Sequence, residues 1–197
     1  MQGEFLRSLV WTDYRLAVLF AVIIPLILLI WAFVQKVDSI VRLMIIYWRV
    51  SSLLAITIYI MIAGWPIAFI SGWFARILIP ISLWFWVDVN EDIADQPQRP
   101  LKLALTSWRW AITIYSTLGA LLSIPFLQCA FVAGVVKTPF CQVWLEPPQL
   151  FKEYFHPGSK PELLGFMGMT CLFFFILYFS YFVLIRLGKQ GRSAMEQ

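Results

Sequence analysis

Four carboxylates stand close together in the segment WVDVNEDIADQPQRP and form the only acidic cluster in the chain. Their spacings of three, four and seven residues put them on one face of a helix that would extend past an apolar segment. One interpretation is a Mg²⁺ site for a diphosphate, but the residue order departs from the usual Asp-rich motif and no second motif follows. We favour a solvated, partner-binding face, compensated at the helix C-terminus by nearby cations or by a basic partner. The four carboxylates are Asp88, Glu91, Asp92 and Asp95, and the nearby cations are Arg99 and Lys102.

The three cysteines and the single histidine offer less chemistry. Cys129 and Cys141 can form a disulfide if their side of the membrane is oxidising. The alternative of two free thiols stays open, because a spacing of twelve residues does not fix the Cβ geometry. Cys171, in the last apolar segment, is expected to be a small core residue. His156 is the only histidine and is expected in a solvated turn. We therefore expect no catalytic residues, no metal site and no cofactor beyond contacts with pigment or lipid.

Composition decides the class of protein. The chain has 197 residues, of which 61% are hydrophobic and only 13% charged. Soluble domains are about 45–50% apolar and about 25% charged, so this chain needs lipid as its solvent. Its fifteen Lys and Arg are dispersed, which argues against a nucleic-acid partner and suits topology signals and lipid headgroups. The sequence therefore predicts an all-α integral membrane protein, folded as one polytopic bundle over residues 1–197.

Five apolar segments are candidate transmembrane helices. The third is the weakest, because the uncharged stretch from Ile77 to Val87 rises only about 16 Å. Extending it toward the N-terminus places Arg76 inside the span, at a cost of roughly 2.5–3.5 kcal/mol at the bilayer centre. We favour five spans, with four plus one re-entrant or interfacial segment as the alternative. The spans are expected near 16–34, 50–70, 73–89, 107–128 and 163–185.

Prolines interrupt four of the apolar runs, and each removes a backbone donor. We expect neighbouring helices or hydroxyls to satisfy the freed carbonyls. The residues are Pro25, Pro66, Pro80 and Pro125. In the connection that follows, Pro147 and Pro148 can open a short helix.

The distribution of Lys and Arg sets the expected orientation. Five spans with the C-terminus inside place nine of them on the inner side, including Lys36, Arg42 and Arg49, and six outside. This margin is small but favours a cytoplasmic C-terminus. We therefore expect an outer loop at 129–162 and a cytoplasmic tail at 186–197.

Three stretches of the sequence are similar to a known family: SLVWTDYRLAVLF from Ser8, WLEPPQLFKEYFHPG from Trp144 and RLGKQGRSA from Arg186. They resemble an uncharacterised family of small multi-pass membrane proteins from cyanobacteria, over nearly the whole chain. The resemblance implies a photosynthetic cell with thylakoid and plasma membranes. It implies no activity and no site residues.

These observations favour a non-enzymatic accessory or assembly protein of a membrane complex, with a photosynthetic complex as the candidate. Its partners would be membrane lipids and another integral membrane protein, met through abundant aromatic surface. The alternative is a small-solute channel or permease, since proline-broken helices often line transport sites. A Mg²⁺-dependent diphosphate-handling membrane enzyme is a third hypothesis.

Overall fold

The computed structural model describes residues 2–132, 134–187 and 192–193, and every regular element in these ranges is helical. The described residues leave out most of the expected tail, namely 188–191, which includes Lys189, and 194–197. They also leave out Met1 and, in the outer loop, Ala133. Four helices are long and apolar enough to cross a membrane, and a pair bent by 53° supplies a fifth if it acts as one span. The protein is thus an all-α membrane protein with four to five transmembrane helices. The four are Gly3–Val34, Asp38–Ile62, Ile67–Trp84 and Pro161–Arg186, and the bent pair is Pro100–Leu122 with Ile124–Phe131.

The first span is one long helix made of α1 (Gln2–Ala17), a π-helical turn η1 (Val18–Ile23) and α2 (Ile24–Val34). It starts well before the expected residue 16, because the polar first turns are also helical. The π turn precedes Pro25, whose ring cannot supply the N–H that the Ala21 carbonyl would normally accept. The backbone N–H of Ile24 donates to the Leu19 carbonyl, five residues back, in place of the usual carbonyl four residues back.

The carbonyls released at this turn are satisfied by other helices, as the sequence predicts. The Tyr47 hydroxyl donates to the Ala21 carbonyl at 2.7 Å, and the Trp108 indole donates to the Phe20 carbonyl at 2.8 Å. Tyr47 is fully buried, and its ring meets Trp108 edge-on at 5.0 Å. Pro25 therefore produces a rigid, internally bonded junction of three helices.

The second and third spans differ from the predicted boundaries. α3 (Asp38–Ile62) and α4 (Ile67–Trp84) meet at a turn that lies inside the segment expected as one span at 50–70. Gly64 adopts a left-handed conformation with φ of 69°, which ends α3, and Pro66 follows two residues later. Pro66 thus lies in the turn at the N-cap of α4 rather than kinking a helix, whereas Pro80 does lie inside α4. Arg42 and Arg49, expected in a connection, lie within α3.

α4 ends before the acidic cluster, which contradicts the expected helix over 73–89 with its acidic extension. Trp86 is extended, and the separate helix α5 (Val87–Asp95) starts after it. Val89 and Ile93 are buried and hold α5 against the bundle. Asp88 consequently lies in the first turn of α5, where the helix dipole favours a carboxylate.

The remaining spans begin at prolines. Pro100 opens α6 (Pro100–Leu122), which starts before the expected residue 107 and bends at its end into η2 (Ile124–Leu127) and α7 (Gln128–Phe131). Pro125 lies after this bend. Pro161 opens α10 (Pro161–Tyr181), which continues as the π-helical η5 (Phe182–Arg186). The candidate span that is not one continuous helix is therefore the fourth, whereas the sequence predicted the third as the weakest.

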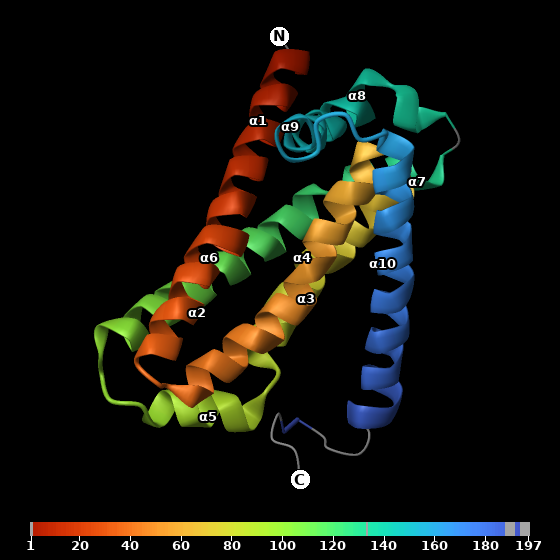
Figure 1. Cartoon of the computed structure of the whole chain (residues 1–197). Helices are drawn as coiled ribbons and strands as arrows, with labels where there is room; N and C mark the ends of the chain where they lie inside the picture. The colour runs from red at the N-terminus through yellow and green to blue at the C-terminus, as the bar shows by residue number, and fades with distance from the viewer. Residues whose placement is uncertain (1, 133, 188–191, 194–197) are drawn as a thin grey trace.

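A cap of short elements connects α7 to α10. It consists of η3 (Val135–Lys137), α8 (Pro139–Gln142), η4 (Val143–Leu145) and α9 (Glu146–Phe155), and Pro147 and Pro148 lie in the first turn of α9 as predicted. Figure 1 shows α8 and α9 at the same end as the start of α1, with α5 and the end of α10 at the opposite end. We call these the cap end and the α5 end.

α3 is the central helix. It packs against α2, α4, α5, α9 and α10, whereas α10 packs chiefly against α3. Small residues permit that contact, since a Cβ on Gly165 would overlap Ala63 and one on Gly168 would lie 2.8 Å from Ile60. The largest apolar core lies toward the α5 end, around Leu43, Met44 and Tyr47 of α3.

Candidate functional site

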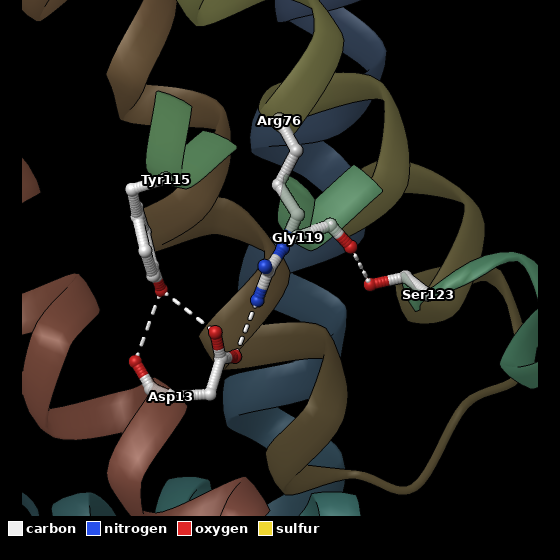
Figure 2. Close-up of polar contacts among 5 residues, drawn as sticks. All are labelled: Asp13, Arg76, Tyr115, Gly119 and Ser123. Atoms are coloured by element: carbon white, nitrogen blue, oxygen red, sulfur yellow. Dashed lines mark hydrogen bonds and ion pairs between the residues drawn. The ribbon is translucent and has the colours of Figure 1, made fainter. Parts of the chain in front are cut away.

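An ion pair inside the bundle joins Arg76 of α4 to Asp13 of α1 (Figure 2). Arg76 lies nine residues beyond the start of α4, about 13.5 Å along the helix. Side chains lean toward the N-terminus of their helix, so the guanidinium points to the cap end, where Asp13 lies. The two side chains are only 14% and 23% exposed. The arginine that seemed costly in a span is therefore neutralised by a carboxylate from another span.

Tyr115 of α6 completes the cluster. Its hydroxyl lies 2.8 Å from Oδ1 of Asp13 and 3.0 Å from the Asp13 carbonyl oxygen. The Arg76 guanidinium lies 5.7 Å from the centre of the Tyr115 ring, within range of a cation–π contact. Both carboxylate oxygens thus have a donor, one from α4 and one from α6. We call these three residues the Asp13 cluster.

Gly119 provides the space for the guanidinium. A Cβ at this position would overlap the Arg76 side chain, which crosses α6 at that point. Figure 2 shows Gly119 beside the guanidinium, and Ser123 donating its hydroxyl to the Gly119 carbonyl. Gly119 therefore accommodates a charged side chain rather than the backbone of another helix.

A cavity of about 150 Å³ borders the Asp13 cluster. Its other walls are mostly apolar and come from the first span, α3, α4 and the cap, with Val18, Leu54 and Phe69 among them. Because both charges of the pair are engaged, this site neutralises charge and fixes three helices against each other. Its geometry suits positioning rather than reaction.

The four predicted acidic residues separate into two environments. Glu91, Asp92 and Asp95 are exposed, whereas Asp88 is half-buried and accepts a hydrogen bond from the Ser193 hydroxyl at 3.1 Å. Lys102, expected to offset the carboxylates, instead donates to the carbonyls of Ala94 and Gln96 at 2.7 Å each and caps the end of α5. Among the described residues, no three His, Cys, Asp or Glu side chains lie close enough to hold a metal ion.

Arg109 holds α5 in place from inside the bundle. It is 5% exposed, and its Nη2 donates to the Leu83 carbonyl at 2.8 Å and to Oδ1 of Asn90 at 2.7 Å. The guanidinium also stacks over Trp84 at 4.1 Å. Arg109 therefore caps the end of α4 and ties the start of α5 to α6.

The two cysteines of the connection are joined. Cys129 of α7 and Cys141 of α8 form a disulfide with their Cα atoms 5.9 Å apart, and both are buried under the cap. Cys171, expected in the core, is instead free and exposed on α10, so that prediction is wrong.

Polar contacts fix the cap to the bundle. Glu146 accepts hydrogen bonds from Arg7 at 2.7 Å and Trp11 at 3.2 Å, and Gln149 donates to the Ile62 carbonyl at the end of α3. His156, expected to lie in a solvated turn, is half-buried, and its Nε2 lies 2.8 Å from the Tyr59 hydroxyl.

Sequence reasoning identified the cost of Arg76 but not the residues that offset it. Asp13 and Tyr115 are 63 and 39 positions away, so no spacing pattern links them to Arg76. The available signal was the arginine itself, since a cation in a span requires a counter-charge. Asp13, just before the first apolar run, was the carboxylate to consider as the counter-charge of Arg76.

Comparison with known proteins gives a family and nothing more specific. No curated protein and no solved structure matches the chain significantly. A family model described as a protein of unknown function (DUF3177) matches residues 7–195, which contain the Asp13 cluster, the acidic helix and the disulfide. The chain therefore belongs to the DUF3177 family.

Proposed function

We propose that this protein is a non-enzymatic accessory or assembly protein that docks onto another integral membrane complex through the exposed acidic side of α5. The observation that carries the proposal is the arrangement of Glu91, Asp92 and Asp95. All three are exposed, and none forms an ion pair with a described residue. Unneutralised like charges on one helix are complementary to a basic loop of a partner.

The acidic helix is presented rigidly. Val89 and Ile93 fix it to the core, Arg109 holds its first turn and Lys102 caps its last turn. A surface that is already ordered loses little conformational freedom on binding, and this favours a docking role.

The broken helices support this function better than a channel. At the break before Pro25, the carbonyls of Phe20 and Ala21 already accept hydrogen bonds from buried side chains. Such carbonyls would have to coordinate the solute in a transport site. Here they stabilise helix packing instead.

The setting is part of the proposal. The positive-inside count favours a cytoplasmic α5 end and C-terminus. The resemblance to cyanobacterial proteins extends the proposal to a complex in a thylakoid or plasma membrane of a photosynthetic cell.

The test compares two charge-neutralised variants in the native host. The full chain carrying Glu91→Gln, Asp92→Asn and Asp95→Asn is extracted in mild detergent and analysed by native gel and mass spectrometry. The matched control removes three exposed carboxylates nearer the cap end, by Glu4→Gln, Glu153→Gln and Glu162→Gln. We expect wild type and control to co-migrate with one larger complex, and the α5 variant to run alone. A wild-type protein that runs alone, or an α5 variant that stays bound, would contradict the proposal.

A further inference from the structure

A crevice lies between α10 and the helices α3 and α4, toward the α5 end. α10 contacts α3 closely at Gly165 and Gly168, and Phe182 of η5 contacts Trp86 with the ring centres 5.7 Å apart. Between these contacts a cavity of about 160 Å³ remains. Figure 1 shows α10 close to α3 near the cap end and farther from it toward the α5 end. We call this space the α10 crevice.

The walls of the α10 crevice are apolar and aromatic. One side of α10 and η5 contributes residues at spacings of three and four, and α3 and α4 contribute aliphatic residues opposite. An apolar cavity of roughly 150 Å³ holds a ligand the size of benzene, so this one accepts a segment of one acyl chain. The wall residues from the last helix are Phe175, Tyr178, Phe179, Phe182 and Val183, with Val50 and Leu78 opposite.

Cations stand at the mouth of the crevice. Arg49 and Arg186 line the same shallow hollow, together with the Tyr178 hydroxyl. Arg49 is exposed and lies eleven residues into α3, about 16 Å along the helix. Its Nη1 donates a hydrogen bond to the Tyr178 hydroxyl at 3.4 Å. No described carboxylate forms an ion pair with it, in contrast to Arg76. A lipid-facing arginine in a span needs a counter-charge.

We infer that the α10 crevice binds an anionic membrane lipid, with its headgroup on Arg49 and part of one acyl chain between α10 and α4. An anionic lipid matches both features, because it carries a negative headgroup and an apolar chain. Arginine suits an oxyanion headgroup because it can donate two hydrogen bonds in parallel. This inference is independent of the docking proposed for α5.

The inference is tested by native mass spectrometry of the purified full chain. The protein is titrated with phosphatidylglycerol and, as the neutral comparison, phosphatidylcholine with identical chains. A basic residue near the headgroup changes binding of an anionic lipid by about fivefold. We therefore expect Arg49→Gln to weaken phosphatidylglycerol binding about fivefold and to leave phosphatidylcholine binding unchanged. The matched control is Arg15→Gln, which removes another exposed arginine from a span and should have no effect.

A second pair of variants tests whether the acyl chain lies in the α10 crevice. Val183→Trp fills the crevice, whereas the adjacent Leu184, which is 77% exposed, points away from it and makes Leu184→Trp the control. We expect only Val183→Trp to reduce phosphatidylglycerol binding, with all variants eluting as folded protein. Equal binding of both lipids by the wild type, equal losses in Arg49→Gln and Arg15→Gln, or full displacement by inorganic phosphate would overturn the inference. A dimer that excludes lipid from this face would do the same.

Discussion

At the scale of single residues, Asp13 and Arg76 form the contact whose loss should most affect stability. Removing one member of a buried pair leaves an uncompensated charge, which typically costs 3–5 kcal/mol, whereas replacing both by apolar residues is often neutral. Both side chains are less than a quarter exposed, so solvent offsets little of this.

We expect Asp13→Leu and Arg76→Met each to lower the free energy of unfolding by about 3 kcal/mol. The double variant Asp13→Leu with Arg76→Met should recover most of that loss. The measurement is a denaturation titration in a fixed detergent, analysed as a double-mutant cycle. Losses that simply add would show that the two residues act independently.

The effect of Gly119→Ala on stability should change sign with the residue at position 76. In the wild type, Gly119→Ala should displace the guanidinium from Asp13 and destabilise the protein by about 1–3 kcal/mol. In the Arg76→Met background the clash is absent, and alanine should stabilise α6 by up to about 1 kcal/mol. Gly3→Ala, where a Cβ meets open space, is the control. The same titration measures all three, and a loss in both backgrounds would mean that the obstruction is not Arg76.

At the scale of elements, the π turn before Pro25 links the first span to α3 and α6. Its geometry depends on donors that lie far away in the sequence, Tyr47 and Trp108. A buried carbonyl that loses its donor costs about 1–3 kcal/mol.

Tyr47→Phe should therefore destabilise the protein by about 1–2 kcal/mol. In a Pro25→Ala background, residue 25 regains an N–H for the Ala21 carbonyl, so the same change should cost less. Tyr154→Phe, at a side chain that is 77% exposed, should stay within about 0.5 kcal/mol of the wild type. Equal losses from Tyr47→Phe in both backgrounds would contradict the idea that the Tyr47 hydroxyl replaces the missing N–H of residue 25 at the Ala21 carbonyl.

The element boundaries show what the sequence could and could not predict. Apolar length and charge placement correctly predicted a helical membrane protein, and proline chemistry predicted that freed carbonyls would find donors. The α3–α4 turn was misplaced because Ala63, Trp65 and Ile67 are as apolar as the helices around them, so hydropathy continues through the break. Gly64 followed by Pro66 was the local signal, and it was read as part of one span. The Asp13 cluster was missed because its three helices come together only in the fold.

At the scale of the whole molecule, the cap and α5 close the two ends of the bundle. The cap is tied to α7 by the disulfide and to the first span and α3 by Glu146, Gln149 and His156. By contrast, α10 is attached mainly along one side of α3, and its span has the smallest buried share of the four continuous spans.

The disulfide should stabilise the whole protein. In the chain-entropy model, a crosslink closing a loop of about 15 residues contributes about 3 kcal/mol, and the separation here is twelve. We expect Cys129→Ala with Cys141→Ala to lower the unfolding temperature measurably, and reductant to do so in the wild type but not in that variant. Cys171→Ala, which removes the free and exposed thiol, should change nothing. Unchanged melting of the double variant would mean that the cap is held by its polar contacts alone.

The Cys129–Cys141 bond also has a consequence for biogenesis. Its sulfurs can be oxidised only after the loop that carries them has been delivered to an oxidising compartment. In the proposed orientation, with the cap on the outer side, a nascent chain inserted upside down would keep both thiols on the reducing side. The ratio of bonded to alkylatable molecules, read as a mobility shift with a polymer-tagged maleimide, would therefore report the fraction of newly made chains that the insertion machinery has oriented correctly.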